Sequence, residues 1–335
     1  MDRQWNDKIF GVTDQGFEGL ALRLFEWQYS GNGIYRQFCD ALGRRPGNVA
    51  SIPEIPFLPV RFFKSFDITT GSFTPDVVFE SSGTTGMLNS RHLVKDITIY
   101  EESFMKAFTR VYGPVEDLVI IGLLPSYLER GNSSLVYMVD RLVRASGRKE
   151  SGFYLDNMAE LAQTLRGLEA GGQRSLLIGV TFALLDFAAS FPMPLRFCQV
   201  METGGMKGRR REMVRAEVQD ILKQAFSLET VHSEYGMTEL LSQAYSTGGG
   251  LFRCPPWMKV VLREEEDPLA IRVAGQEGGR SGTFTGAVNI IDLANIHSCN
   301  FIATDDAARL HGDGSFEILG RLDHSDLRGC SLLSL

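Results

Sequence analysis

Between residues 77 and 235 the sequence alternates short apolar runs with helical patterns, and this alternation restricts the folds that the chain can adopt. The runs that predict strands are 77–79, 118–124, 176–180, 195–201 and 230–233. The helices predicted between them are 99–111, 133–145, 157–169, 182–189 and 212–226. Because the central runs are almost continuously apolar, both faces of these strands should be covered. The sequence therefore predicts an α/β fold with a mostly parallel sheet between layers of helices.

The two ends of the chain have a different character. Residues 14–43 predict two helices, and the glycine- and proline-rich stretch 43–60 predicts an irregular but buried segment. The α/β region is followed by short β-like stretches at 257–263, 269–274, 283–292 and 298–303, separated by glycine and charged residues. The sequence His311-Gly312-Asp313-Gly314 is typical of a hairpin turn between strands at 307–310 and 316–319. We expect the chain to have three parts: an α/β core at 1–245, a small β-rich subdomain at 246–320, and a short tail at 321–335 that carries Cys330.

Composition and charge exclude several classes of protein. The 335 residues are 44% hydrophobic and 22% charged, as in ordinary globular proteins. A net charge of −7 argues against a nucleic-acid-binding protein. The 5 cysteines form no CxxC pair, so we expect no zinc ribbon, no disulfide framework and a cytoplasmic location. The longest apolar stretch, residues 176–185, is too short to span a membrane.

The most specific local motif is a loop of small and hydroxylated residues after the first predicted strand. It reads Ser81-Ser82-Gly83-Thr84-Thr85-Gly86. Its glycines allow backbone N–H groups to turn inward, and its hydroxyls add short donors, so the loop is suited to phosphate oxygens. Taken alone, the same residues are equally compatible with a surface turn. The chain contains no GxxxxGK[ST] sequence, so this is not a Walker loop.

A second motif supplies further groups that a nucleotide needs. It reads Tyr235-Gly236-Met237-Thr238-Glu239, follows the strand at 230–233, and is expected to open a helix at 240–243. An aromatic ring can stack on a base, a hydroxyl can bind phosphate, and a carboxylate can hold Mg²⁺ against phosphate oxygens. The alternative interpretation is an ordinary junction between a strand and a helix.

A third motif is spread over the last part of the chain. It combines Thr304-Asp305-Asp306 with Asp313-Gly314 and Gly320-Arg321. A carboxylate here can accept both hydroxyls of a ribose, and an arginine can reach ribose or phosphate oxygens. Individually, these residues are also compatible with turns and a surface ion pair.

Together and in this order, the three motifs resemble those of the adenylate-forming superfamily of acyl-CoA synthetases, luciferases and peptide-synthetase adenylation domains. The [ST]SGTTG and YGxTE motifs of that family are present in full, and Asp305 replaces the glycine of its TGD motif. The resemblance implies the family's N-terminal core of layered α/β sheets with helices. It also implies ATP and Mg²⁺ as cofactors and a carboxylic acid as substrate.

The resemblance assigns expected roles to residues of this chain. Glu239 would hold Mg²⁺, Asp306 would bind the ribose hydroxyls and Arg321 would assist. Thr84, Thr85 and Thr238 would contact phosphates. Gly204 and Gly205 resemble the family's Gly-Gly stretch beside the acyl and adenine pockets. The residues expected to bind the nucleotide are Ser81, Ser82, Gly83, Thr84, Thr85, Gly86, Gly204, Gly205, Tyr235, Gly236, Asp306 and Arg321.

Several segments resemble one branch of this superfamily, the acyl-protein synthetases of bacterial luminescence operons (LuxE-type), which are akin to phenylacetate-CoA ligase-like proteins. The matching segments are 25–28, 35, 38–39, 55–60, 63–64, 133–138 and 325–330. In that branch ATP activates a fatty acid as acyl-AMP. The acyl group then moves to a cysteine near the C-terminus and on to a partner reductase. Cys330 matches that cysteine by position, and it would join Glu239, Thr238 and Arg321 as a catalytic residue.

Two departures from the family leave alternatives open. The loop continues Met87-Leu88-Asn89-Ser90-Arg91 instead of Pro-Lys, and Arg91 is a candidate to replace the lysine. The chain ends fourteen residues after Arg321, so the lid domain with its catalytic lysine is expected to be missing or vestigial. The acyl acceptor could be Cys330, coenzyme A or a carrier-protein thiol. Outside the enzyme class, the alternative is a nucleotide-binding scaffold for a reductase or an acyl carrier.

Overall fold

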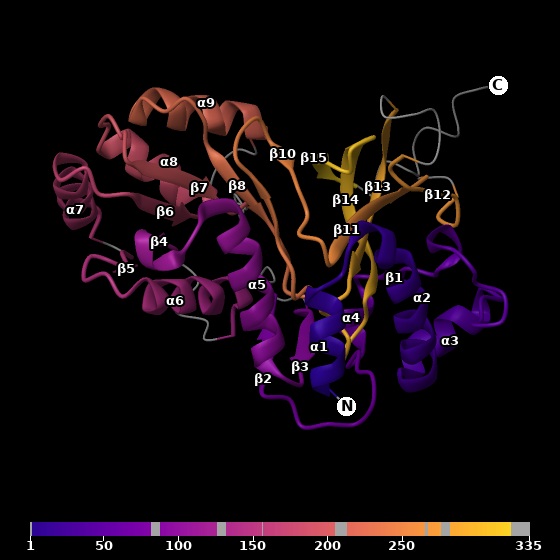
Figure 1. Ribbon diagram of the computed structural model, residues 1–335. Coiled ribbons are helices and arrows are strands. Elements are labelled where there is room, and N and C mark those ends of the chain that lie inside the picture. The colour runs from indigo at the N-terminus through magenta and orange to yellow at the C-terminus, as the bar shows by residue number, and fades with distance from the viewer. Residues whose placement is uncertain are drawn as a thin grey trace, which may run out of the picture.

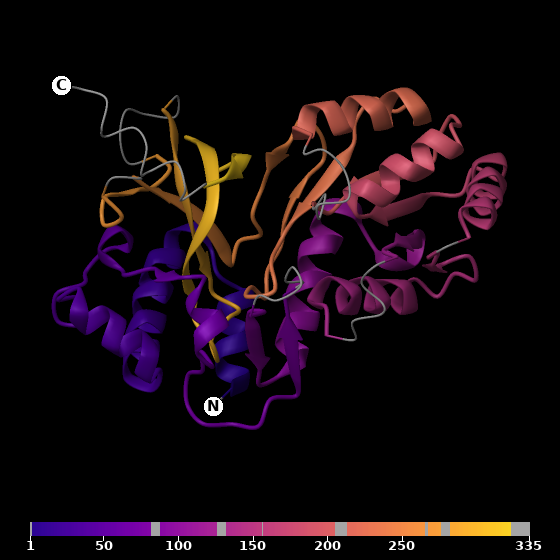
Figure 2. The same cartoon turned by 180° about the vertical axis from the view of Figure 1, so that it is seen from behind.

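The computed structural model describes residues 2–81, 88–125, 132–155, 157–204, 213–264, 267–275 and 282–322, with side chains from Trp5 onward. Figures 1 and 2 show two halves side by side. One half is a sheet flanked by helices, and the other is a second sheet that stands against the N-terminal helices.

The first half contains a six-stranded sheet in the order β5-β4-β6-β7-β8-β9. Its strands are β4 (Val119–Leu123), β5 (Gly152–Phe153), β6 (Ser175–Gly179), β7 (Cys198–Glu202), β8 (His232–Tyr235) and β9 (Ala244–Ser246). All neighbouring pairs are parallel except β8 with β9. Every residue of β4 and β6 is buried, so both faces of the central strands are covered. The predicted α/β fold with a mostly parallel sheet is confirmed.

The helices of this half agree closely with those predicted from the sequence. They are α5 (Ile97–Tyr112), α6 (Ser134–Ser146), α7 (Met158–Ala170), α8 (Thr181–Ser190) and α9 (Arg215–Phe226). In Figure 1, α8 and α9 lie above the sheet, whereas α5 and α6 lie below it. A short 3-10 helix, η2 (Val115–Asp117), leads from α5 into β4. Asp96 begins α5, because its side chain accepts a 2.9 Å hydrogen bond from the Thr98 N–H.

The second half contains a seven-stranded sheet in the order β10-β15-β14-β13-β11-β12, with β1 added in parallel to β14. Its strands are β1 (Leu58–Pro59), β10 (Leu251–Phe252), β11 (Met258–Arg263), β12 (Ile271–Arg272), β13 (Thr283–Asp292), β14 (Phe301–His311) and β15 (Phe316–Arg321). Apart from the β1 pair, neighbouring strands are antiparallel. The predicted β14–β15 hairpin is confirmed, and Gly314 turns it with a φ of 82°.

The polar triplet 304–306 lies inside a strand, which corrects one prediction. The sequence pattern predicted separate strands at 298–303 and 307–310. Instead β14 runs through the triplet, because β13 and β15 pair with it on both sides and satisfy its backbone groups. A register shift between Ala307 and Ala308 follows the triplet directly. Such irregularities re-aim side chains, and this one lies beside Asp306.

The N-terminal helices pack against this second sheet. They are α1 (Asp2–Phe10), α2 (Asp14–Gly31) and α3 (Gly33–Ala41). The two helices predicted at 14–43 are confirmed, and Asn32 separates them by capping the Tyr35 N–H at 2.9 Å. The buried Gln28 amide donates to the Asn295 carbonyl at 3.1 Å, and the Tyr35 ring stacks on Phe301 at 6.1 Å. Packing thus joins the two ends of the chain, while the predicted domain division stays a prediction.

The connection between the N-terminal helices and the parallel sheet begins with a long, irregular segment that buries side chains such as Ile52, Ile55 and Leu58. It contains the 3-10 helix η1 (Ile52–Glu54), strand β1 and helix α4 (Phe62–Ser65). Strands β2 (Val77–Glu80) and β3 (Arg91–Val94) then form a separate antiparallel pair. Residues 82–87, which join them, lie outside the described residues. Within the described ranges, no helix combines the length and the apolar character needed to cross a bilayer.

Candidate functional site

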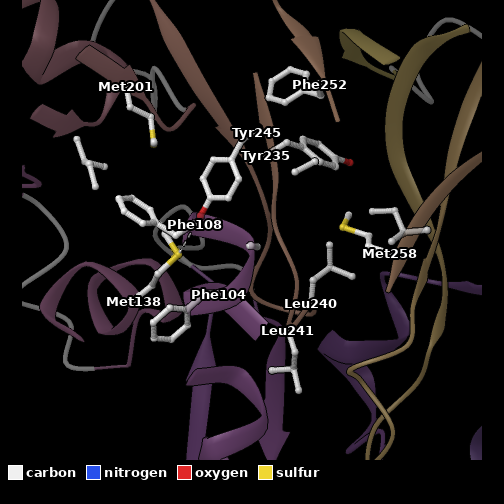
Figure 3. Close-up of a cluster of buried hydrophobic side chains, with 14 of the residues drawn as sticks. Phe104, Phe108, Met138, Met201, Tyr235, Leu240, Leu241, Tyr245, Phe252 and Met258 are labelled. Atoms are coloured by element: carbon white, nitrogen blue, oxygen red, sulfur yellow. Dashed lines mark hydrogen bonds between the residues drawn. The ribbon is translucent and has the colours of Figure 1, made fainter. Parts of the chain in front are cut away.

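Two of the predicted motifs meet where the two sheets adjoin. Tyr235 ends β8 in the parallel sheet, and its hydroxyl donates a 2.8 Å hydrogen bond to Oδ2 of Asp306 in β14. The Tyr235 ring packs edge-on against Phe252 at 5.9 Å and Phe316 at 5.6 Å, and Figure 3 shows Tyr235 beside Phe252. These ring contacts hold the hydroxyl on the carboxylate. The second and third motifs therefore form one site.

Asp306 is partly buried, and its oxygen Oδ1 accepts no hydrogen bond from the side chains of the described residues. Arg321 lies opposite Asp306 in the β14–β15 register, with its Nε 3.8 Å from Oδ1, which is too long for a hydrogen bond. Burial raises the pKa of Asp306, while the Tyr235 hydrogen bond and the Arg321 charge act in the opposite direction. A carboxylate in this state has acceptor capacity left for ligand hydroxyls.

Arg321 is placed to reach a ligand. Its side chain is 76% exposed, and its charge acts on Glu239 as well as on Asp306. The neighbouring Asp305 is engaged elsewhere, because Arg61 pairs with it at 3.5 Å. The arginine expected to assist the nucleotide therefore lies near both carboxylates of the predicted site.

The chain after Tyr235 makes a turn rather than the helix predicted at 240–243. The Leu240 N–H bonds back to the Met237 carbonyl at 3.1 Å, and the chain returns as β9 beside β8. The cause lies in the other sheet. The buried Asp292 accepts hydrogen bonds from the Leu241 N–H at 2.7 Å and the Ser242 hydroxyl at 2.6 Å, so these groups are used for tertiary contacts instead of a helical turn.

Glu239 lies in this turn and is only 5% exposed. Burial raises the pKa of Glu239, and the Ser90 side chain and the charges of Lys64 and Arg321 lower it partly. Ser90 also holds the beginning of the first motif. Its N–H donates to the Ser81 hydroxyl at 2.8 Å, and its carbonyl accepts from the Ser81 N–H at 3.0 Å. The described end of the first motif is therefore tied to the neighbourhood of Glu239.

Two residues that sequence reasoning missed hold the backbone of the turn. The buried His92 ring, in β3, contacts the Thr238 carbonyl through Nδ1 at 2.8 Å and Asn295 Oδ1 through Nε2 at 3.0 Å. The Asn295 amide in turn donates to the Glu239 carbonyl at 2.8 Å. Burial lowers the pKa of His92 to about 4, so the ring is neutral at neutral pH. No local spacing pointed to these residues, because each acts through contacts distant in sequence.

A pair of acidic residues lies beside the second motif, at the ends of β7 and β8. Glu202 is buried, pairs with Arg215 at 3.0 Å and accepts the Gly204 N–H at 2.9 Å. Burial and the charge of Glu202 raise the pKa of Glu234 to about 8. A Cβ at Gly236 would overlap a Glu234 carboxylate oxygen, so the motif glycine allows this close approach. Gly204 has a φ of 59°, which favours glycine.

An apolar cluster lies next to the motif and consists largely of aromatic and methionine side chains. Figure 3 shows Phe104, Phe108, Met138, Met201 and Tyr245 in it, with the Tyr245 hydroxyl directed at the Met138 sulfur, 3.9 Å away. His232 belongs to the same region, where it bonds and stacks on Tyr112. His232 is therefore part of the packing of this cluster.

Several predicted site residues lie outside the described residues. They are Ser82, Gly83, Thr84, Thr85, Gly86, Gly205 and Cys330. The described cysteines are Cys39, Cys198, Cys254 and Cys299. Burial raises the pKa of all four thiols, which disfavours a reactive thiolate. Arg91, the candidate to replace a loop lysine, is paired with Asp67 at 2.9 Å.

The carboxylates of the site fit a magnesium ion held chiefly by a ligand. In the described part of the chain, no group of three or more His, Cys, Asp or Glu side chains could form a metal cage. Mg²⁺ is often bound by one or two carboxylates together with substrate phosphates and water. Glu239, with its nearby Ser90 hydroxyl, is suited to that kind of site.

Comparison with solved structures finds a similar fold in other proteins. The chain is similar to ATP-bound MatB from Rhodopseudomonas palustris, with 15% identity, a TM-score of 0.54, and 75% of this chain and 49% of that chain covered. It is also similar to 2-hydroxyisobutyryl-CoA ligase in the postadenylation state in complex with R3-HIB-AMP. That match has 12% identity and a TM-score of 0.62, and it covers 92% of this chain and 68% of that chain.

A third similar structure is the luciferase-like enzyme from the mealworm Zophobas morio, with 13% identity, a TM-score of 0.50, and coverage of 76% of this chain and 60% of that chain. No family model matches the chain, and no curated protein matches its sequence. The chain spans about half the length of the MatB structure. These likenesses show the fold alone, which is the layered arrangement of α/β sheets with helices that this chain shares with parts of those structures.

Proposed function

We propose that this protein binds ATP at the junction of its two sheets and uses it to activate a carboxylic acid as an acyl-adenylate. The observation that carries the proposal is the contact between Tyr235 and Asp306, with Glu239, Ser90 and Ser81 beside it. Residues from three motifs that suit ribose, metal and phosphate thus converge at one place. The similar structures that hold ATP or an acyl-adenylate support the same ligand class.

In this proposal each described residue has a defined task. Asp306 accepts the ribose hydroxyls, and its own hydrogen bond from Tyr235 keeps the carboxylate oriented. Glu239 holds Mg²⁺, which when bound supplies positive charge to the phosphate oxygens. Arg321 offsets negative charge between these two points. A substrate carboxylate oxygen bonds to the α-phosphorus, and the bond to pyrophosphate breaks with its electron pair leaving on pyrophosphate.

The second half of the proposed reaction transfers the acyl group to a thiol. The Cys330 thiolate attacks the acyl carbon, a thioester forms, and AMP leaves with the electrons of the anhydride bond. The raised pKa values of the four described thiols support Cys330 as the nucleophile rather than any of them. A partner reductase would then take the acyl group, as in the LuxE-type branch. Coenzyme A or a carrier-protein thiol is the alternative acceptor.

Exchange of labelled pyrophosphate into ATP, measured with a panel of carboxylic acids, tests the first half. We expect exchange that depends on the acid, and a loss of at least about 100-fold in Asp306→Asn and Glu239→Gln. ATP binding without exchange for any acid would contradict the ligase proposal and favour the nucleotide-binding scaffold. For the second half, Cys330→Ser should keep exchange but lose hydroxylamine-sensitive acyl labelling. Equal labelling of this variant, or labelling only with added coenzyme A, would contradict the role of Cys330.

A further inference from the structure

A segment from the N-terminal part of the chain docks beside the predicted nucleotide site. Strand β1 pairs in parallel with β14, with Pro59 opposite Ala303, and the Val60 N–H donates to the Ala303 carbonyl at 2.8 Å. Ala303 directly precedes the triplet that contains Asp306. The four-residue helix α4 follows β1, so its side chains are anchored to the strand that carries the ribose-binding carboxylate.

Helix α4 also contacts the hairpin that carries the first motif. The Phe63 ring is 1% exposed and packs edge-on against His92 in β3, with centroids 6.0 Å apart. His92 in turn contacts the Thr238 carbonyl of the turn that holds Glu239. Figure 1 shows α4 between β1 and β3. The backbone at Lys64, the residue after Phe63, is therefore held close to both β14 and β3.

Lys64 differs in its contacts from the other basic residues around the site. Arg61 pairs with Asp305 at 3.5 Å, Arg91 pairs with Asp67 at 2.9 Å, and Arg321 lies 3.8 Å from Asp306. Lys64 is exposed and forms no ion pair with any described residue, although its charge acts on Glu239. Lys64 follows Phe63, whose ring contacts His92 beside the Thr238 carbonyl, so Lys64 belongs to the segment next to the turn that carries Glu239.

We propose that Lys64 binds the phosphate chain of ATP at the end away from the ribose, and so supplies the positive charge that the first motif lacks. This inference rests on the proposed ATP site. Residues 81–91 contain no lysine, and the one arginine among them, Arg91, is engaged by Asp67. A flexible ammonium group is a common phosphate ligand, because it offers three donors on a long stem. Lys64 would thus act on the β- and γ-phosphates together with the metal held by Glu239.

Binding calorimetry with ATP and with AMP, both in the presence of Mg²⁺, tests this inference. We expect Lys64→Ala to weaken ATP binding about 10-fold, equal to about 1.4 kcal/mol, and to change AMP binding less than about twofold. Lys64→Arg should keep most of the ATP affinity, and Lys64→Gln should behave like Lys64→Ala. The matched control is Lys149→Ala, because Lys149 is 90% exposed and its ion pair is with its neighbour Glu150.

The outcomes separate this inference from the proposed function. If the unmodified protein binds ATP and Lys64→Ala binds it equally well, the role of Lys64 is wrong while the ATP site stands. If Lys64→Ala loses ATP and AMP to the same extent, Lys64 does not act on the distal phosphates, and the inference is overturned. If the unmodified protein binds neither nucleotide, the proposed function fails as well. Thermal melts should coincide for all variants, since the Lys64 side chain is exposed.

Discussion

The hydroxyl of Tyr235 donates a 2.8 Å hydrogen bond to Asp306, and this contact links the last parallel strand of one sheet to a central strand of the other. The same junction brings Glu239, Ser90 and Arg321 together. Because the two sheets supply different groups, a ligand bound here would contact residues of both sheets.

Tyr235→Phe should weaken ATP binding roughly 10-fold, because a hydrogen bond to a charged group is worth about 1.5–3 kcal/mol. The substitution should also shift the pH dependence of ATP affinity. The Tyr235 hydrogen bond lowers the pKa of Asp306, so its loss raises that pKa, and the acid limb of ATP affinity moves to higher pH. Calorimetry across pH measures both effects. Tyr29→Phe is the matched control, since Tyr29 donates an equally short 2.8 Å bond to Asp40 at a remote exposed place. An unshifted limb in Tyr235→Phe would contradict the assignment of Asp306.

Asp292→Ala should destabilise the protein by about 3 kcal/mol or more. The substitution leaves the Leu241 N–H, the Ser242 hydroxyl and the Ala294 N–H without their common buried acceptor. Urea unfolding measures the change. The turn that carries Glu239 should loosen at the same time, so the Mg²⁺ concentration needed for ATP binding should rise. A stable variant with unchanged Mg²⁺ dependence would show that Asp292 does not set this turn.

His92 should make the folded state sensitive to mild acid. Its pKa of about 4 in the folded protein lies below the ordinary value of 6.5, so the unfolded chain binds the proton more readily. The free energy of unfolding should therefore fall as pH decreases from about 6.5 to 4, by up to roughly 3 kcal/mol from this residue. His92→Gln should remove that part of the slope. Equal slopes in both proteins would mean that the ring is protonated in the folded state, donating to both Thr238 and Asn295.

Gly236→Ala should reduce both stability and ATP binding, because the added Cβ would overlap the Glu234 carboxylate and approach Gln243 at 3.2 Å. Removing the Glu234 carboxylate should restore much of the lost stability. The double variant Gly236→Ala/Glu234→Ala is therefore expected to melt closer to the unmodified protein than Gly236→Ala does. Differential scanning fluorimetry of the unmodified protein, Gly236→Ala, Glu234→Ala and the double variant measures this coupling. If the changes in melting temperature of the two single variants simply add in the double variant, the contact with Glu234 does not cause the destabilisation by Gly236→Ala.

The sequence predicted the parts of the fold that depend on local pattern. The continuous apolar runs at β4 and β6 identified buried parallel strands, and the polar residues around Gly314 identified the β14–β15 hairpin. The second and third motifs indicated groups that the structure brings together, since Tyr235 contacts Asp306 and the turn after Tyr235 carries Glu239. Their roles toward a nucleotide stay predictions.

The remaining features depend on contacts between residues far apart in sequence. The helix expected at 240–243 does not form, because Asp292 takes the hydrogen-bond donors of Leu241 and Ser242. The triplet at 304–306 lies in a strand because β13 and β15 flank it. Helix α4, which carries Lys64, follows a strand that pairs with β14, more than two hundred residues later in the chain. No local periodicity encodes such pairings.

A crystal structure of the protein with ATP and Mg²⁺ tests the central proposal most directly. We predict that the ribose hydroxyls lie within hydrogen-bonding distance of Asp306, with the phosphate chain beside Glu239 and Ser81. A nucleotide bound at any other place, or with its ribose away from Asp306, would contradict the proposal.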